Sequence, residues 1–168
     1  LRGNPGGYLH IANQMCDEFL KNGELIVFTE GRNRSKEETF ATSNGQLEDI
    51  NIIVLIDEGS ASASEIISGA IQDNDRGLVI GRRSFGKGLV QEQIAMNDGS
   101  VIRLTTQRYY TPSGRCIQKE YGNNKKDYYL EQYTRDKKIE HPDSLIYTTK
   151  NGRTVYGGGG ITPDIIIK

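Results

Sequence analysis

Residues 51 to 80 read NIIVLIDEGSASASEIISGAIQDNDRGLVI, in the order strand, helix, strand. Asn51 to Ile56 are nearly all apolar, which is typical of a strand covered on both faces in a parallel sheet. A helix is expected from Ser62 to Gln72, and Leu78 to Ile80 form the next strand. Because this order fits within about 30 residues, the segment predicts a βαβ unit and an α/β fold.

The pattern changes to a period of two after the βαβ unit. Leu89 to Ile94 and Val101 to Thr106 alternate between apolar and polar residues, and Asn97-Asp98-Gly99 lies between them. Alternation around such a turn is typical of a β-hairpin. The sequence therefore predicts an antiparallel extension of the α/β fold.

The segment before residue 51 contains a helix, a strand and a polar stretch. Leu9, Ala12 and Cys16 recur at helical spacing, so a helix is expected from Tyr8 to Lys21. Leu25 to Thr29 read as a short strand. The stretch from Gly31 to Asp49 is polar and without clear periodicity, which predicts an exposed loop.

The last third of the chain carries less pattern. Residues 119 to 150 are rich in charge and tyrosine, and a surface insert with some helix around Tyr128 to Lys137 is expected there. Gly157 to Gly160 predict a flexible turn, and Ile161 to Ile167 predict a closing strand.

Length and charge limit the classes of function. A chain of 168 residues suits one domain. Lys plus Arg number 21 and Asp plus Glu number 22, so no net field favours a nucleic acid or an anionic membrane. No run of about 18 apolar residues is present. The chain begins without Met, and we interpret it as a piece excised from a longer protein.

Cysteine and histidine do not form a metal-binding pattern. Cys16, Cys116, His10 and His141 are scattered and lack the spacing of zinc ligands. Neither a metal nor another cofactor is expected. Cys16 lies on the apolar face of the first helix, where a buried free thiol is the common outcome. The cysteines alone therefore do not indicate the cellular compartment of the protein.

Three serines, Ser60, Ser62 and Ser64, join the first strand of the βαβ unit to its helix. A serine at a helix N-terminus has unpaired main-chain N–H groups beside it, and these can stabilise an oxyanion. A capping box is the alternative, because Ser62 to Glu65 matches its pattern. The segment alone favours capping and does not choose among the serines.

A serine nucleophile needs a base, and Lys87 is the best candidate. Neither histidine has the sequence context of a catalytic base. Lys87 lies between Gly86 and Gly88 at the start of a strand, and burial there would favour the neutral amine that a base requires. Gln91 could orient that amine, although an exposed polar strand residue is the simpler interpretation.

Two glycine-rich segments allow further interpretations. Gly81 to Lys87 fit the start of a phosphate-binding P-loop, but Gly88 replaces the required Ser or Thr and a strand follows instead of a helix. The opening Gly3 to Gly7 could present an N–H group to an oxyanion, or could be only a turn.

Five motifs together resemble the C-terminal processing peptidases, also called tail-specific proteases, which have a Ser-Lys active site. Their order and spacing match that family over almost the whole chain. The motifs are LRGNPGG at 1–7, GSASASEI at 59–66, SFGKGLVQ at 84–91, RYYTPSGR at 108–115 and GGITPD at 159–164.

The resemblance implies a role for individual residues. Ser62 would be the nucleophile, Lys87 the general base and Gln91 the residue that orients it. The oxyanion hole would be formed by the N–H of Ala63 and an N–H of Gly6 or Gly7. These roles outweigh the capping interpretation of Ser62.

The resemblance also implies the wider setting. The fold would be α/β, with the stacked βαβ units of the Clp protease and crotonase superfamily. Substrates would be proteins recognised near apolar C-terminal tails, in the periplasm of the bacterial cell envelope. A PDZ domain, a helical region and an upstream strand would precede residue 1 in the full-length protein, which could be a homo-oligomer. A catalytically inert peptide- or ligand-binding module on the same fold is the alternative.

Overall fold

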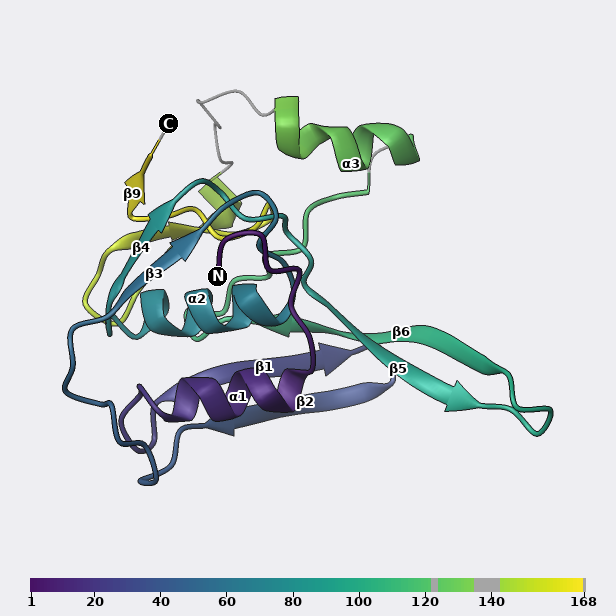
Figure 1. Ribbon diagram of the computed structural model, residues 1–168, viewed down its shortest axis with the longest axis horizontal. Helices are drawn as coiled ribbons and strands as arrows, with labels where there is room; N and C mark the ends of the chain where they lie inside the picture. The colour runs from purple at the N-terminus through teal and green to yellow at the C-terminus, as the bar shows by residue number, and fades with distance from the viewer. Residues whose placement is uncertain (122–123, 135–142, 168) are drawn as a thin grey trace.

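A buried helix, α2 (Ala63–Asp73), lies at the centre of the protein between two sheets (Figure 1). The computed structural model describes residues 1–121, 124–134 and 143–167. All eleven residues of α2 are buried. None of the helices in these ranges is long and apolar enough to cross a membrane.

The first sheet is parallel and contains the predicted βαβ unit. Its strands are β3 (Ile53–Ile56), β4 (Leu78–Gly81) and β9 (Ile165–Ile166), in the order β3-β4-β9. β3 and β4 pair from Ile53 with Leu78 to Ile56 with Gly81. The helix α2 crosses between them, so the prediction of strand, helix and strand is confirmed.

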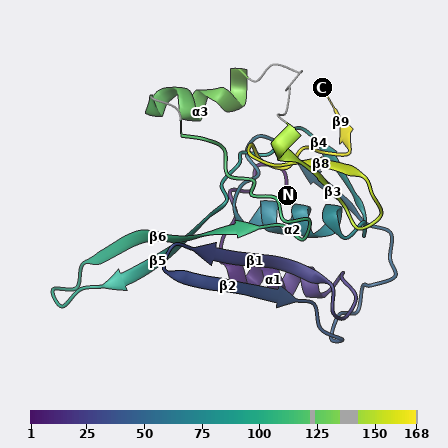
Figure 2. The ribbon, with the colours of Figure 1, turned by 180° about the vertical axis from the view of Figure 1, so that it is seen from behind.

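The second sheet is antiparallel and covers the other side of α2. Its strands are β1 (Leu25–Gly31), β2 (Arg34–Phe40), β5 (Leu89–Ala95) and β6 (Val101–Tyr110), in the order β2-β1-β6-β5. β5 and β6 form the predicted hairpin and extend well beyond the body of the protein (Figures 1 and 2). The α/β fold with an antiparallel extension is therefore confirmed.

The remaining elements lie around these two layers. α1 (Leu9–Asp17) packs against α2 and β1, and Cys16 is fully buried in that contact. The Cys16 and Cys116 thiols are both free. α3 (Lys125–Thr134) overlaps the predicted helix Tyr128–Lys137, whose residues 135–137 lie outside the described ranges. A short 3-10 helix, η1 (Asp143–Leu145), precedes the hairpin of β7 (Ile146–Thr148) and β8 (Thr154–Tyr156).

A buried ion pair fixes the C-terminal end of α2. Arg115 and Asp73 have no exposed side-chain surface, and their N–O distance is 2.7 Å. The Arg115 guanidinium also donates to Gln72 Oε1 at 2.7 Å and to the Tyr156 carbonyl at 2.9 Å. Such pairing compensates for the desolvation of both charges. It joins the helix to the loop after β6 and to β8.

Two sequence-based predictions about strands were wrong. The expected exposed loop from Gly31 to Asp49 contains β2, which pairs with β1 as a charged edge strand. The segment Asn51 to Ile56 was predicted to be covered on both faces, yet Ile53 is 61% exposed while Ile56 is fully buried. An apolar run identifies a strand but does not show which of its faces is covered.

The C-terminal segment also differs from the prediction. Gly157, Gly159 and Gly160 are buried, and the N–H groups of Gly158 and Gly160 donate to the carbonyls of Cys116 and Ile117 at 2.8 Å. A Cβ at Gly160 would lie 2.5 Å from the Ser84 carbonyl oxygen. Close packing, and not flexibility, therefore explains this glycine. The closing strand is reduced to Ile165–Ile166, while Ile161 belongs to the core.

Candidate active site

Ser62 has a strained main chain at the junction of β3 and α2. Its φ of 55° and ψ of −117° lie outside the regions that L-residues commonly adopt, and an ordinary N-cap residue has extended dihedrals. The capping-box pattern with Glu65 is present, with Glu65 Oε2 accepting the N–H of Ser62 at 2.8 Å. A cap alone does not require the strain at Ser62, whereas a nucleophile on a sharp strand-to-helix turn does.

The structure distinguishes the three serines, which the local sequence pattern around them left equivalent. The Ser60 hydroxyl donates to the Leu1 carbonyl at 2.9 Å and accepts from the N–H of Asp57 at 3.0 Å. The Ser64 hydroxyl donates to the Asn4 carbonyl at 3.0 Å. Both are buried and hold the N-terminal segment, whereas Ser62 lines an open cavity.

The N-terminal segment of residues 1–7 packs directly against the Ser62 turn. The N–H of Ala61 donates to the Asn4 carbonyl at 3.0 Å. Gly6 has a φ of +93°, and a Cβ there would lie 2.5 Å from the Ala61 carbonyl oxygen and 2.6 Å from the Ala63 nitrogen. Only glycine fits this contact without displacing the main chain of the turn.

Asp57 binds the same N-terminal segment at Arg2 and Gly3. Its Oδ1 accepts the N–H of Gly3 at 2.8 Å and that of Gly59 at 3.0 Å, and Arg2 lies 3.5 Å from Oδ2. Burial by itself raises the pKa of this carboxyl, but the two N–H donors and Arg2 together outweigh it and lower the pKa below its usual value. Asp57 therefore stays charged near neutral pH.

Glu65 connects the Ser62 turn to the loop that carries Lys87. The Glu65 carboxylate is fully buried. Its Oε2 accepts the main-chain N–H of Ser62 at 2.8 Å and of Lys87 at 2.9 Å. Its Oε1 accepts the N–H of Gly86 at 2.7 Å and the Ser84 hydroxyl at 2.5 Å. One side chain thus fixes the main chain at both candidate catalytic residues.

The electrostatic state of Glu65 reflects two opposing effects. Burial raises its pKa and is the larger effect, while the four hydrogen-bond donors lower it. The Ser84 oxygen accepts the N–H of Ile161 at 2.6 Å, so its proton is directed to Glu65. All four neighbours therefore act as donors, and a carboxylate can accept from each of them.

Tyr109 contacts the main-chain carbonyls of the same two residues. Its hydroxyl lies 2.6 Å from the Lys87 carbonyl oxygen and 3.1 Å from that of Ser62, and the residue is 1% exposed. Burial, with smaller effects from Glu65 and Cys116, raises the pKa of this phenol well above its usual value. The hydroxyl therefore keeps its proton and donates it between the two carbonyls.

The Lys87 loop is also held on its outer side. Gly88 donates its N–H to Gln118 Oε1 at 2.9 Å, and the N–H of Lys119 donates to the Gly86 carbonyl at 3.0 Å. The Lys119 ammonium lies 4.2 Å from the centres of both the Phe85 and Tyr128 rings. α3 is thereby anchored to the loop through Tyr128.

A cavity of about 410 Å³ contains most of the residues expected at the active site. Ser62, Ala63, Lys87, Gln91 and Gly7 all line it, together with Tyr109. Gly6 packs against the Ser62 turn without lining the cavity, and its N–H donates to Asn4 Oδ1 at 2.9 Å. Ala63 is the first residue of α2, so its N–H has no acceptor within the helix.

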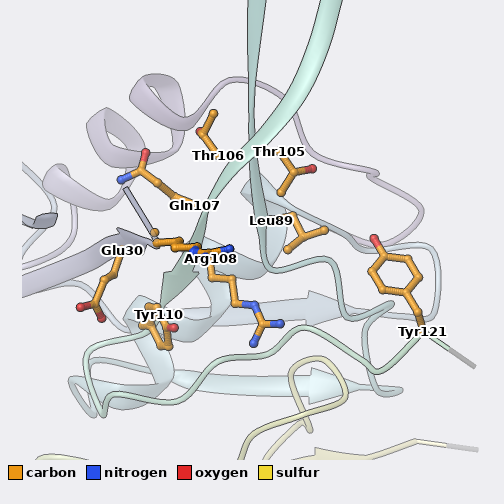
Figure 3. A pocket seen from close by; sticks show the side chains of 10 residues that line it. Glu30, Leu89, Thr105, Thr106, Gln107, Arg108, Tyr110 and Tyr121 are labelled. Carbon is orange, nitrogen blue, oxygen red and sulfur yellow. The ribbon is translucent and has the colours of Figure 1, made fainter. Parts of the chain in front are cut away.

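A second hollow of about 600 Å³ contains none of the proposed catalytic residues (Figure 3). Glu30, Arg108, Tyr110 and Tyr121 line it. Arg108 and Tyr110 therefore line this second hollow, whereas Tyr109, which lies between them in the sequence, lines the cavity with Ser62. We assign the candidate chemistry to the smaller cavity.

The structure does not support the P-loop alternative. The chain continues from Lys87 into the strand β5, whereas a P-loop needs a helix whose N-terminus faces the phosphates. In residues 1–121, 124–134 and 143–167, no group of three or more His, Cys, Asp or Glu side chains is arranged to bind a metal ion.

Sequence reasoning missed the positions of Glu65 and Tyr109. Glu65 was considered only as a partner in a capping box, and Tyr109 only as part of the RYYTPSGR motif. A buried acid inside an apolar helix was the available signal for Glu65, because such a charge requires several partners. No comparable signal identified Tyr109, whose two acceptors lie far away in the sequence.

Comparisons with known proteins identify the family of this chain. The model of peptidase family S41 matches residues 1–129. A carboxy-terminal-processing protease of Bartonella bacilliformis is 52% identical over 119 residues, covering 70% of this chain and 27% of that protein. The carboxy-terminal processing protease CtpB of Bacillus subtilis is 40% identical over 121 residues, covering 71% of this chain and 25% of that protein.

Solved structures show the same fold. The photosystem II D1 C-terminal processing protease superposes with a TM-score of 0.69 and 26% identity, over 99% of this chain and 33% of that one. A putative S41 protease from Bacteroides fragilis gives a TM-score of 0.64 at 13% identity, over 100% of this chain and 36% of that one. The present chain spans about a quarter of the length of the curated relatives described above.

Proposed function

The chain belongs to peptidase family S41, and on that premise we propose that it carries the active site of a serine endopeptidase. Ser62 is the nucleophile and Lys87 the general base. The observation that carries this proposal is the difference among the three serines. Ser60 and Ser64 hold the N-terminal segment, whereas the strained Ser62 lines the same cavity as Lys87.

The first half of the reaction forms an acyl-enzyme. The neutral amine of Lys87 accepts the proton of the Ser62 hydroxyl while Oγ bonds to the scissile carbonyl carbon. The carbonyl oxygen becomes an oxyanion. The carbon–nitrogen bond then breaks, and the Lys87 ammonium returns its proton to the leaving amine. An ester between Ser62 and the N-terminal part of the substrate remains.

The second half of the reaction hydrolyses that ester. Lys87 accepts a proton from water as the water oxygen bonds to the ester carbon. The bond to Ser62 Oγ breaks, the serine regains its proton, and the product leaves with a new carboxylate. Lys87 therefore serves as base and acid in both halves.

Main-chain N–H groups stabilise the oxyanion in this proposal. The free N–H of Ala63 at the start of α2 is one donor. Gly7 is a better second donor than Gly6, because the Gly6 N–H already donates to Asn4 and Gly7 lines the cavity. Gln91 lines the cavity from β5, and in this proposal its side chain orients the Lys87 amine.

The proposed substrates are proteins cleaved near apolar C-terminal tails. The names of the relatives in Bartonella bacilliformis and Bacillus subtilis support this, since both are carboxy-terminal processing proteases. A periplasmic location, a PDZ domain elsewhere in the full-length protein and a homo-oligomeric state are further parts of the proposal. The near balance of charge gives no support to a nucleic-acid partner.

Covalent labelling of the full-length protein tests the proposal without a known substrate. An organophosphorus electrophile should modify Ser62, and peptide mass spectrometry should find the adduct there and not on Ser60 or Ser64. Labelling should fall about a hundredfold or more in Lys87→Ala, which lacks the proposed base. A labelling rate that is equal in the parent protein and Lys87→Ala would contradict Lys87 as the base.

The same experiment distinguishes the peptidase from the alternative function, a binding module without catalysis. A non-catalytic binding module would bind peptides in the cavity while Ser62 stayed unmodified at every pH. Peptide binding that is unchanged in Ser62→Ala, together with an absence of labelling, would favour that binding module over the peptidase.

A further inference from the structure

The projecting β5–β6 hairpin has two chemically different faces. Residues opposite each other in an antiparallel pair share a face, and the face alternates along each strand. Ile94 opposite Ile102 and Glu92 opposite Leu104 therefore lie on one face. Gln91 opposite Thr105 and Gln93 opposite Arg103 lie on the other face, which is polar up to the apolar pair of Ala95 and Val101 near the tip.

The polar face of the hairpin continues the active-site cavity. Gln91, Gln93 and Arg103 line the same cavity as Ser62 and Lys87. The rise of a strand is about 3.4 Å per residue, so Gln93 and its partner Arg103 lie about 7 Å beyond Gln91 along the hairpin. A peptide bound in extended form at Ser62 would cover that distance with about two residues.

The charges that line this cavity are all positive. Lys87 and Arg103 are its only charged lining residues in the part of the chain that the structure describes. Because Lys87 is assigned to catalysis, Arg103 is the charged side chain left to bind substrate. A cation beside a peptide-binding cavity attracts a carboxylate and repels Lys or Arg side chains of a substrate.

No carboxylate of the hairpin compensates Arg103. Glu92 lies on the opposite face, where it accepts from Arg34 at 3.1 Å and from the Thr106 hydroxyl at 3.0 Å. Asp98 at the tip is bonded to Ser100 at 2.6 Å. No residue in the described ranges forms an ion pair with Arg103.

We propose that Arg103 is a specificity-determining residue that binds a carboxylate of the peptide substrate. The guanidinium presents a planar pair of N–H donors that matches a carboxylate. The carboxylate has two possible sources. One is an acidic side chain of the substrate, about two residues along the peptide from the substrate residue next to Gln91. The other is the α-carboxylate at the C-terminus of the peptide. This inference rests on the proposed peptidase function and specifies the substrate class for the same cavity.

Matched peptides test the inference with the full-length protein. One neutral parent peptide is made with a single Glu at each successive position around the cleavage site, and every peptide is made with a free and an amidated C-terminus. The kcat and KM are measured for the parent protein, Arg103→Gln, Arg103→Lys and Arg108→Gln. Arg108 is a matched control because it lies on the same strand but lines the other hollow.

The expected result is a change of preference. The parent protein should prefer one acidic peptide over its neutral counterpart about tenfold in kcat/KM, mainly through KM. Arg103→Gln should abolish that preference, Arg103→Lys should restore part of it, and Arg108→Gln should keep it. A preference that follows one Glu position identifies a side chain, whereas one lost on amidation identifies the α-carboxylate.

A preference that is equal in the parent protein and Arg103→Gln would overturn the inference. A binding titration separates its failure from failure of the proposed function. Fluorescently labelled peptides are titrated into Ser62→Ala and into Ser62→Ala with Arg103→Gln. If the parent protein cleaves none of the peptides but the titration shows acid-selective binding that requires Arg103, the carboxylate site is retained and the peptidase is rejected. If the parent protein cleaves the peptides but neither cleavage nor binding is acid-selective, the peptidase is retained and the carboxylate site is rejected.

Discussion

Ser62 and Lys87 are joined by two shared hydrogen-bonding partners, Glu65 and Tyr109. Glu65 Oε2 accepts the main-chain N–H of both residues, at 2.8 and 2.9 Å. The Tyr109 hydroxyl lies between their main-chain carbonyl oxygens, at 3.1 and 2.6 Å. The main chain at each residue is therefore fixed through an N–H and a carbonyl group. Such a frame sets the relative position of two side chains that come from separate elements.

Glu65→Gln should damage both stability and activity. The Gln amide nitrogen would face main-chain N–H or hydroxyl donors in a buried site, leaving donors without acceptors. We expect a loss of about 2–3 kcal/mol in the free energy of unfolding and about a hundredfold loss in kcat/KM. Urea unfolding and peptide cleavage measure the two effects.

The control for Glu65→Gln is Glu58→Gln, which breaks the partly exposed pair with Arg82. That change should cost no more than about 1 kcal/mol and leave kcat/KM within about twofold. If Glu65→Gln also kept kcat/KM within twofold while fully folded, Glu65 would have no positioning role.

Tyr109→Phe removes the hydroxyl and keeps the ring. Two partly buried carbonyls lose a donor, so we expect about 1–2 kcal/mol less stability. The kcat should fall about tenfold with KM nearly unchanged, because the change alters the positions of Ser62 and Lys87 without touching the peptide. Steady-state kinetics on the variant, with Tyr110→Phe as control, test this. A rise in KM alone would instead place Tyr109 in substrate binding.

Alanine substitution of the three serines should separate structure from chemistry. Ser60→Ala and Ser64→Ala lose buried hydrogen bonds to the N-terminal segment, so thermal unfolding should show about 1–2 kcal/mol less stability. Both should retain cleavage at temperatures where they are folded. Ser62→Ala should be at least as stable as the parent and inactive. Activity in Ser62→Ala would remove it as nucleophile.

Asp57 predicts a pH dependence of stability with a defined sign. Its pKa is lowered in the folded protein, so its charged form stabilises the fold at pH values above the unfolded pKa of about 3.9. That contribution is lost as pH falls through the lower folded pKa. The difference in unfolding free energy between the parent and Asp57→Asn should therefore be constant from about pH 5 to about pH 8, which is above the unfolded pKa of ~3.9. It should shrink below about pH 4.

Urea unfolding over that pH range measures the Asp57 contribution. The exposed Asp49→Asn should differ little from the parent at any pH, which makes it a suitable control. A difference for Asp57→Asn that persisted unchanged to about pH 2 would show that the carboxylate charge does not hold Gly3.

The sequence identified those parts of the fold whose pattern is local. The apolar run before Asp57, the helix after Ser62 and the alternation around Asn97 each lie within one element and its turn. β2 was missed because its exposed, charged residues lack an apolar face, although Lys36 pairs with Glu38 at 2.6 Å and lies over Phe28. Edge strands of this kind are defined by pairing with a neighbour, which no local pattern records.

The candidate site was predictable as a set of residues but not as an arrangement. The motifs placed Ser62, Lys87 and Gln91 together, and the structure brings all three to one cavity. The family resemblance pointed to Ser62, but the physical reason, which is where Ser60 and Ser64 direct their hydroxyls, is absent from the local pattern. Those acceptors, the Leu1 and Asn4 carbonyls, lie more than fifty residues away in the chain. Tertiary contacts alone supply that information.

Cleavage of an unstructured protein with an apolar C-terminal tail tests the central claim most directly. The full-length protein is compared with Ser62→Ala and Lys87→Ala, with folding of each verified by circular dichroism. If Ser62 and Lys87 are nucleophile and base, the parent cleaves the tail and each variant loses about a thousandfold or more in kcat. If all three proteins behave alike, Ser62 is only the strained cap of α2, and the cavity is a binding site without catalysis.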